Sequence, residues 1–180
     1  IFDAINVKID VIIHLASITN AEESFKIKKK LYKNNFGIFK NVVNFCKKKK
    51  AKLIHISSTS IYGTQSEKVD ESCSNLKPQS PYADIKLLEE KMLKKLNKKI
   101  NFITFRFGTI TGISKGMRFH TAVNKFCLNA SLGLPLTVYK TAMNQFRPYL
   151  CLSDAFKLVK FTLENNFFNN DIYNALSENC

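Results

Sequence analysis

A tyrosine and a lysine four residues apart, Tyr82 and Lys86, are the residues of this sequence best suited to chemistry. On a helix this spacing places both side chains on one face, about one turn apart. A tyrosine ordinarily loses its proton near a pH of about 10, but a neighbouring ammonium group favours the phenolate. Tyr82 could therefore act as a general base or acid on a sugar or alcohol hydroxyl. Ser58 could bind the same substrate oxygen and hold it for hydride transfer.

The Tyr-x-x-x-Lys spacing is weak evidence by itself. A lysine-rich chain with six tyrosines is expected to contain about one such pair by chance. Its position adds weight, because Tyr82 follows Ser80 and Pro81, which are typical of a helix start. Ser58 ends a predicted strand that neighbours this helix in the expected alternation. The pattern therefore indicates one site, built from a strand end and a helix start.

The elements that must hold these residues alternate along the chain. Short apolar runs rich in β-branched residues predict buried strands, and apolar residues at helical spacing predict helices between them. The predicted strands are 10–16, 52–57, 102–107, 136–139 and 172–176. The predicted helical regions are 21–46, with a break near 34–37, then 80–97, 119–132 and 153–164, the last capped by Ser153 or Asp154. Residues 64–79 are predicted to form a surface loop over the site. This order predicts a parallel sheet with helices on both faces, whose ligands bind beyond the carboxyl ends of the strands.

The composition is that of a globular chain that can bury one core, so we expect a single structural unit. No apolar run approaches the roughly 20 residues of a membrane-spanning helix, so no membrane association is predicted. The net charge of +14 raises nucleic acid as a partner. Nearly all of this charge is lysine, however, and the run at 47–50 follows a helical pattern, where cations favour the helix dipole. A solvated helix end is therefore preferred to a nucleic-acid surface.

The five cysteines and three histidines are scattered. They contain no C-x-x-C pair, and no histidine has a second ligand three or four residues further along a helix. An odd number of cysteines suits a reducing compartment. We therefore predict unpaired thiols, no metal site and a cytoplasmic location.

Several segments stand in a recognisable order along the chain. They are 10–17 (DVIIHLAS), 34–37 (NNFG), 56–63 (ISSTSIYG), 80–86 (SPYADIK), 106–112 (RFGTITG) and 146–154 (FRPYLCLSD). This set resembles the extended short-chain dehydrogenase/reductase family, in its nucleotide-sugar epimerase and dehydratase branch, over essentially the whole chain. The resemblance implies an α/β, Rossmann-like doubly wound parallel sheet, an NAD cofactor with NADP not excluded, and a nucleotide-sugar substrate.

The resemblance also implies a role for each matching residue. Tyr82 and Lys86 would be the catalytic base and its partner, and Ser58 the catalytic hydroxyl beside them. The residues implied to line the cofactor are Leu15, Ala16, Ser17, Asn34, Ser57, Tyr82, Lys86, Phe107 and Gly108. The residues implied to contact the substrate are Ser58, Thr109, Arg118 and Arg147. Arg147 matches an arginine that holds the substrate diphosphate, a role that suits a forked guanidinium.

Two departures from the family pattern narrow the chemistry. Sugar 4,6-dehydratases carry an acidic pair where this chain has Thr59 and Ser60, which argues against dehydration. Many 4-epimerases carry an asparagine where this chain has Thr109. The substrate contact at Thr109 is therefore left open, and Arg118 could take part of that role.

The resemblance further predicts that the chain is an internal fragment, truncated at both ends. Residues 1–112 would be part of the dinucleotide-binding domain without its first strands and Gly-rich turn. Residues 113–180 would mix the end of that domain with the start of the substrate-binding lobe. The fragment alone is expected to be inactive, and the whole protein could be a homodimer.

Three functions stay open from the sequence. The first is an epimerase that transiently oxidises a sugar carbon, and the second is a reductase that acts on a keto-sugar. The third is a nucleotide-binding or RNA-binding scaffold without catalysis, against which Ser58, Tyr82 and Lys86 argue.

Overall fold

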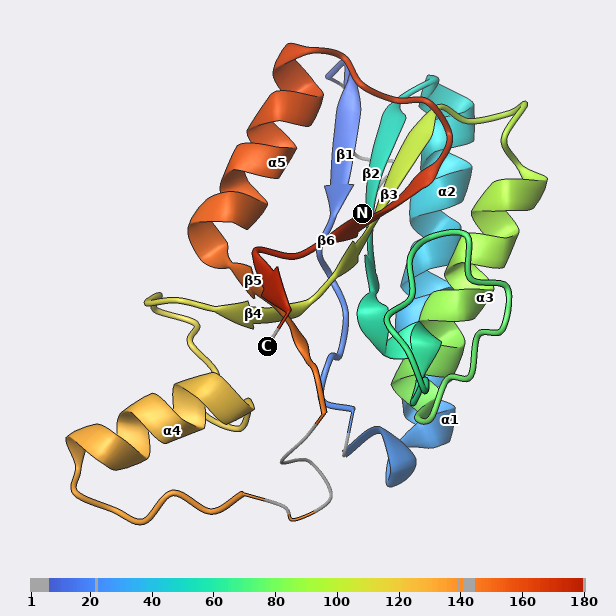
Figure 1. The fold of residues 1–180 in the computed structure, drawn as a ribbon. Helices are drawn as coiled ribbons and strands as arrows, with labels where there is room; N and C mark the ends of the chain where they lie inside the picture. Colours follow the sequence, from blue (N-terminus) through green and yellow to red (C-terminus); the bar gives the residue numbers. More distant parts are fainter. Residues whose placement is uncertain (1–6, 22, 139, 141–144, 180) are drawn as a thin grey trace.

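The computed structural model describes residues 7–21, 23–138, 140 and 145–179. Its centre is a four-stranded parallel sheet (Figure 1). The strands, in spatial order, are β1 (Val11–His14), β2 (Lys52–Ser58), β3 (Phe102–Phe107) and β6 (Ile172–Ala175). Each lies within a predicted strand or extends it by one residue. The predicted parallel sheet is therefore confirmed.

Helices cover both faces of this sheet. Helices α2 (Gly37–Lys49) and α3 (Pro81–Lys95) lie on one face, and α5 (Leu152–Glu164) lies on the other (Figure 1). Parallel strands need long crossover connections, and here a helix serves in each. The sequence expectation of helices on both faces is thus confirmed.

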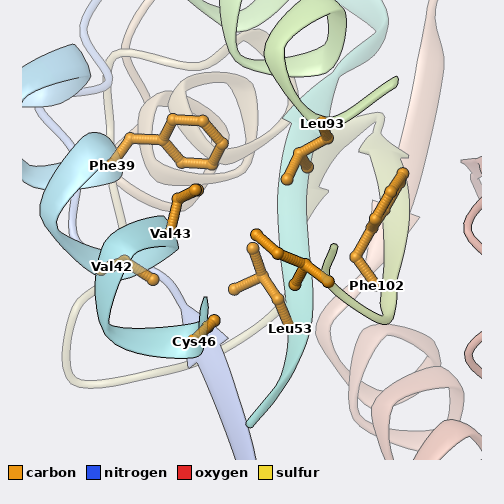
Figure 2. Close-up of a cluster of buried hydrophobic side chains, with 8 residues drawn as sticks. Phe39, Val42, Val43, Cys46, Leu53, Leu93 and Phe102 are labelled. Atoms are coloured by element: carbon orange, nitrogen blue, oxygen red, sulfur yellow. The ribbon is translucent and has the colours of Figure 1, made fainter. Parts of the chain in front are cut away.

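Two apolar cores form because side chains alternate across a strand. Phe102 and Leu53 join the core under α2 and α3, part of which is drawn in Figure 2. Ile103 and Phe105 join the core on the other face, with Ala155 of α5. Full burial of one such side chain contributes about 1.5–3 kcal/mol. The two cores clamp the sheet and hold the carboxyl ends of its strands at one edge.

The region before α2 is helical but irregular. It contains a 3-10 turn (Glu23–Phe25), the short α1 (Lys28–Leu31) and a π-helical turn (Tyr32–Phe36) that runs directly into α2. The break predicted near 34–37 is therefore a change in helical pitch. Helix α2 ends at Lys49 and is followed by its C-cap Lys50, whose backbone is left-handed with φ of 56°.

Helix α3 starts as the sequence predicts. The Ser80 side chain caps it by accepting a hydrogen bond from the Ala83 N–H at 3.2 Å, and Pro81 occupies the first turn. The turn between β2 and the loop is a 3-10 helix (Thr59–Tyr62). Residues 64–79 contain neither helix nor strand, as predicted. Gly63 is required there, since its φ is 64° and a Cβ would lie 1.9 Å from the Lys77 carbonyl oxygen.

A second, small sheet was not predicted. It consists of β4 (Thr109–Thr111), β5 (Pro148–Cys151) and β7 (Glu178–Asn179), with β4 parallel and β7 antiparallel to β5. These strands have four residues or fewer, too few to carry a readable alternation. The sheet continues from the end of β3, so it forms a wall beside the strand ends.

Two predictions in the carboxyl-terminal part were wrong. Residues 136–138 form no strand, and Tyr139 lies outside the described residues. The N-cap of α5 is Cys151, without a side-chain cap. Asp154 lies in the first turn instead, where its carboxylate accepts hydrogen bonds from Ser177 Oγ at 2.6 Å and Lys157 Nζ at 3.0 Å.

The helix predicted over 119–132 is present as α4 (Ala122–Ser131), followed by a left-handed Gly133 with φ of 66°. Within the described residues, no helix is both long and apolar enough to cross a membrane. The four cysteines in that part of the chain are free thiols.

Candidate active site at the strand ends

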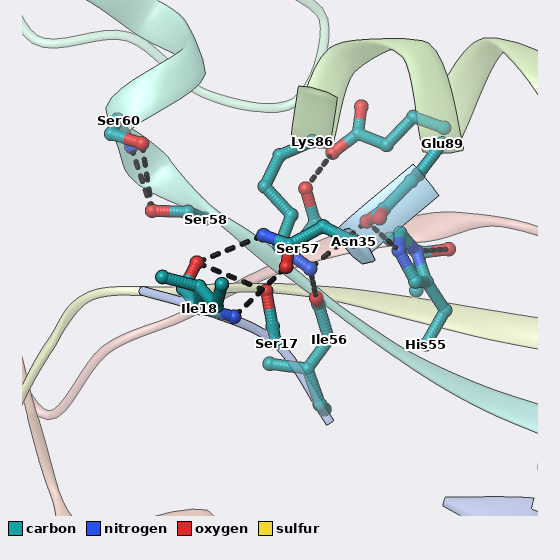
Figure 3. Close-up of polar contacts among 12 residues, drawn as sticks. Ser17, Ile18, Asn35, His55, Ile56, Ser57, Ser58, Ser60, Lys86 and Glu89 are labelled. Carbon is teal, nitrogen blue, oxygen red and sulfur yellow. Dashed lines mark hydrogen bonds and ion pairs between the residues drawn. The ribbon is translucent and has the colours of Figure 1, made fainter. Parts of the chain in front are cut away.

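The carboxyl ends of β2, β3 and β6 meet at one edge of the sheet. Ser58 pairs in register with Phe107, which pairs with Ala175. Ser58 is the last residue of β2, so its side chain lies where the strand gives way to the 3-10 turn. The Ser58 Oγ accepts hydrogen bonds from the backbone N–H of Ser60 at 3.2 Å and from its hydroxyl at 2.9 Å. These contacts hold the Ser58 hydroxyl at the strand end (Figure 3).

Tyr82 and Lys86 share one face of α3, as their spacing predicts. The Lys86 Nζ lies 5.9 Å from the centroid of the Tyr82 ring, and Ser58 lies close enough to Tyr82 to lower the pKa of its phenol. The sequence suggested that Lys86 would lower the Tyr82 pKa, and it does. Burial of the phenol outweighs this, however, so the pKa of Tyr82 lies above its ordinary value.

Lys86 is held from two sides. Its Nζ donates to the Ile56 carbonyl oxygen and to Glu89 Oε2, both at 2.9 Å, and the residue is only 2% exposed (Figure 3). Glu89 Oε2 also bonds His55 Nε2 at 3.0 Å. On the far side of the ring, His55 Nδ1 lies 3.2 Å from Thr104 Oγ1. The ammonium of Lys86 therefore belongs to a buried chain of charged and polar groups.

The pKa values in this chain of groups follow from burial and pairing. Burial lowers the pKa of His55, and the carboxylate of Glu89 opposes this only in part. Burial alone would raise the pKa of Glu89, but the hydrogen bond to His55 and the charge of Lys86 bring it below its ordinary value. Lys86 and Glu89 thus form an ion pair beside a neutral His55.

A second buried network lies next to the first. Glu90 accepts from Arg106 Nε at 3.0 Å and Arg106 Nη2 at 2.7 Å, and from Ser57 Oγ at 2.5 Å. Arg106 Nη1 also donates to the Tyr62 hydroxyl at 2.7 Å, which donates to Asn174 Oδ1 at 2.8 Å. This network ties β2, α3, β3 and β6 together. The resemblance implies that Ser57 lines the cofactor. In the structure Ser57 is buried, and its hydroxyl donates a hydrogen bond to Glu90.

The residues implied for the cofactor at the end of β1 lie together. Leu15 and Ala16 are exposed there, and Ser17 is half-buried, with its hydroxyl donating to the Ile18 carbonyl oxygen at 3.4 Å. Asn34 is half-buried in the π-helical turn, and its Nδ2 lies 3.5 Å from Asn35 Oδ1.

Asn35, which the sequence reasoning missed, fixes the loop after β1. Its Oδ1 accepts from the Ile18 N–H at 2.9 Å, and its Nδ2 donates to the Ile18 carbonyl oxygen at 2.8 Å (Figure 3). Asn35 is 1% exposed. The irregular helical pitch turns this residue inward beside Asn34, and the sequence signal for that was only the expected break.

A cavity of about 720 Å³ opens beside the strand ends. Of the predicted site residues, its lining includes Ser58, Phe107, Gly108, Thr109 and Arg147. The loop over 64–69 forms part of the rim, as the sequence analysis anticipated. This cavity is large enough for part of a small organic ligand.

The glycine at the cavity edge has a packing role. A Cβ on Gly108 would come within 2.8 Å of the Pro148 carbonyl oxygen. Gly108 therefore lets β5 approach the end of β3, whereas the resemblance implied that it flanks the nicotinamide. It still lines the cavity, so the two roles are compatible.

The two predicted substrate arginines are exposed. Arg147 donates to Gln145 Oε1 at 2.6 Å at the cavity rim. Arg118 does not line the cavity, although its charge acts to lower the pKa of Tyr82. No group of His, Cys, Asp and Glu side chains among the described residues could hold a metal ion.

The sequence motifs gave no role to Glu89, Glu90 or His55. A signal was present: polar residues occupy alternate positions of β2 and β3, on the face that α3 covers. The residues concerned are His55, Ser57, Thr104 and Arg106. Polar residues repeated on a covered face need partners, and α3 supplies them one turn after Lys86.

Two curated proteins resemble this chain over most of its length. The chain is 26% identical over 166 residues to ADP-L-glycero-D-manno-heptose-6-epimerase of Brachyspira hyodysenteriae. This alignment covers 89% of this chain and 52% of that protein. An uncharacterized UDP-glucose epimerase of Bacillus subtilis is 29% identical over 155 residues, covering 83% of this chain and 47% of that protein. The chain thus spans about half the length of the curated relatives it matches.

A solved structure shares the fold. UDP-glucuronic acid 4-epimerase from Bacillus cereus, in complex with UDP-glucuronic acid and NAD, superposes with a TM-score of 0.83 at 27% identity. The match covers 94% of this chain and 54% of that one. The Rossmann-like class implied by the resemblance is therefore confirmed. The family model described as NAD dependent epimerase/dehydratase family matches residues 1–175, and this chain accordingly belongs to that family.

Proposed function

We propose that this chain carries the catalytic centre of an NAD-dependent nucleotide-sugar epimerase. The observation that carries the proposal is the position of Tyr82 beside Lys86 on α3 and close to Ser58, which lines the cavity at the strand ends. The likeness to sugar-nucleotide epimerases over most of the chain supports it. In this proposal residues 1–112 contribute to the dinucleotide-binding domain, and residues 113–180 lead into the substrate-binding lobe.

The residues at the end of β1 and on α3 fit an NAD cofactor. Leu15 and Ala16 offer exposed apolar surface at a strand end, where dinucleotides bind in doubly wound sheets. The buried Thr19 hydroxyl has no hydrogen-bond partner within the described part of the chain. Lys86 has partners there for two of its three N–H groups. The Thr19 hydroxyl and one N–H of Lys86 are thus available to bind a cofactor.

The proposed reaction gives each side chain one task. When bound, oxidised NAD would accept a hydride from a sugar carbon and later return it, and its positive ring would favour a phenolate nearby. Tyr82 takes the proton of the sugar hydroxyl as that carbon is oxidised. It returns the proton when the resulting ketone is reduced from the opposite face. Ser58 donates a hydrogen bond to the same oxygen and keeps it within reach of Tyr82.

Epimerisation is preferred to dehydration because no carboxylate occupies the turn after Ser58. Thr59 Oγ1 donates to the Phe107 carbonyl oxygen at 3.3 Å, and the Ser60 hydroxyl donates to Ser58 Oγ. Neither side chain can serve as the acid or base that removes water from a sugar at neutral pH.

The substrate class follows from the rim of the cavity. Arg147 extends from a cavity wall with a planar, bidentate donor group, which suits a diphosphate. We therefore propose a nucleoside-diphosphate sugar as the substrate, with its sugar directed toward Ser58 and Tyr82.

Tyr82→Phe in the complete protein tests the proposal. The variant should lose about 10²–10⁴-fold in kcat for nucleotide-sugar epimerisation, the usual contribution of a general acid or base, with an unchanged unfolding transition. Tyr32→Phe, at an exposed position outside the cavity lining, is the matched control and should keep full activity. Full activity in Tyr82→Phe contradicts the proposal. Consumption of NAD(P)H with a keto-sugar, without any epimer formed, would instead identify a reductase.

A further inference from the structure

Glu89 is a buried carboxylate that bonds directly to Lys86 of the catalytic pair, and the proposed reaction gives it no task. The Glu89 side chain is 1% exposed. Glu89 follows Lys86 by less than one turn of α3, and its Oε2 accepts a hydrogen bond from the Lys86 ammonium at 2.9 Å. Burying an ionised carboxylate is unfavourable unless close partners compensate. A leucine or valine here would fill the same space without that penalty, so the carboxylate calls for an explanation.

The contacts of Glu89 restrict Lys86 strongly. An ammonium has three N–H donors, and here the Ile56 carbonyl oxygen and Glu89 Oε2 accept two of them. Because Ile56 lies on β2 and Glu89 on α3, the two acceptors fix the ammonium between strand and helix. Only the third N–H remains to point toward the site. Lysine side chains otherwise have many rotamers of similar energy, so this arrangement selects one of them.

The carboxylate also offsets the charge of Lys86 next to Tyr82. Lys86 favours the phenolate of Tyr82 and Glu89 disfavours it, so the two act in opposite directions on one hydroxyl. His55 does not cancel Glu89, since its buried ring is held neutral. Tyr82 therefore faces an ion pair, where the sequence suggested a lone cation.

The charged and titratable groups around Glu89 come from three elements. They are Tyr82, Lys86 and Glu90 on α3, His55 on β2 and His14 on β1. Helix α2 presents the ring of Phe39, which packs against both histidines. Arg118 acts on Tyr82 from the segment before α4. Of these groups, Glu89 alone bonds directly to Lys86 through a side chain.

We propose that Glu89 is a positioning residue: through Oε2 it holds the Lys86 ammonium in place and offsets its positive charge beside Tyr82. The consequence is a Tyr82 that stays protonated to higher pH than a lone lysine would allow. Glu89 thereby sets the pH range of the reaction without touching substrate. This inference rests on the proposed function only for its effect on turnover, because the protonation of Tyr82 can be measured directly.

The test is the titration of Tyr82 in the complete protein carrying Glu89→Gln. A glutamine keeps the shape of the side chain and an acceptor for Lys86 but removes the charge. With tyrosine labelled at Cζ and the Tyr82 signal assigned by Tyr82→Phe, NMR should show the midpoint of Tyr82 moving down by at least about half a pH unit, within the range of neighbouring-charge effects. The acid limb of the kcat profile should move in the same direction. Glu89→Asp, which keeps the charge, should restore most of the parent midpoint.

The matched control is Glu164→Gln, which removes an exposed carboxylate on α5 and should leave the midpoint unchanged. Should Glu89→Gln fail to fold, Glu89→Met removes the same charge and provides the same measurement. An unchanged or higher Tyr82 midpoint in the folded variant overturns the proposal. If Tyr82→Phe retains full activity, the proposed function fails, while the NMR titration still decides the role of Glu89.

Discussion

The region proposed for proton transfer and the region proposed for substrate binding differ in how deeply their charged side chains are buried. Between β2, α3 and β3, the charged side chains Lys86, Glu90 and Arg106 are each at most 3% exposed, and each has at least two polar partners. Between β4 and α5, Arg118 and Arg147 are exposed, and the ion pair of Asp154 with Lys157 lies in solvent. The same residue types thus serve two physical roles.

The contrast shows where precision is built into this chain. Proton transfer depends on distances that must be held to a fraction of an ångström, and buried, multiply bonded side chains provide that. Phosphate recognition by exposed arginines tolerates movement, because the attraction between charges is less directional. The contrast has three measurable consequences, and the loss of a buried ionic partner should be the largest.

Removal of Arg106 should produce the largest loss of stability. Arg106→Met leaves Glu90 buried without its bidentate partner, so the free energy of unfolding should fall by about 3–5 kcal/mol. Urea denaturation measures this. Lys157→Met, at the exposed pair on α5, is the matched control and should cause no measurable loss. The double variant with Glu90→Leu should recover much of the stability. An equal loss of stability in Arg106→Met and Lys157→Met would show that the buried and the exposed charges do not differ in their contribution to stability.

Acid should destabilise the buried region, and His14 should contribute to this together with His55. Burial lowers the pKa of His14 from 6.5 to about 4, so the unfolded chain binds a proton in that interval before the folded one does. Stability is therefore fully present above about pH 6.5 and is lost as the pH falls toward 4. The loss from His14 should reach roughly 3 kcal/mol at the lower end, counted at 1.36 kcal/mol per pKa unit.

Denaturation at a series of pH values separates this histidine from an exposed one. His14→Leu should make the dependence of stability on pH between 4 and 6.5 less steep, because one of two buried histidines with a lowered pKa is gone while His55 remains. His120→Leu, in the exposed segment before α4, should leave the dependence as it is in the parent. A similar flattening in both variants would show that burial of His14 is not its cause.

Loss of Arg147 should have the smallest energetic effect and should concern binding alone. Arg147→Ala should raise KM for a nucleoside-diphosphate sugar about tenfold, equivalent to about 1.4 kcal/mol, because a charge-assisted contact is lost. Its unfolding transition should stay unchanged, since the side chain is exposed. Lys125→Ala, an exposed charge on α4, is the control and should change neither quantity. A destabilised Arg147→Ala protein would show that Arg147 contributes to the stability of the fold and not to binding alone.

The sequence was most informative where local rules are strong. Alternating strand and helix patterns predicted the sheet, and Ser80 with Pro81 predicted the start of α3. The Tyr82 and Lys86 spacing predicted one shared helix face. Local rules were weaker at short elements. They missed the small sheet of β4, β5 and β7 and wrongly predicted a strand over 136–138, because a few residues carry too little pattern to separate strand from loop.

What the sequence determined by itself is the identity and order of the reactive groups: Ser58 at a strand end, then Tyr82 and Lys86 one turn apart on the following helix. These relations are local, and periodicity reads them directly. Only the tertiary structure decided the surroundings of Lys86, because Glu89, Ile56 and His55 meet it through the packing of α3 on the sheet. The pKa of Tyr82 depends on burial and on charges brought together from distant segments, and the field at one hydroxyl is the sum of contributions that no single stretch of sequence contains.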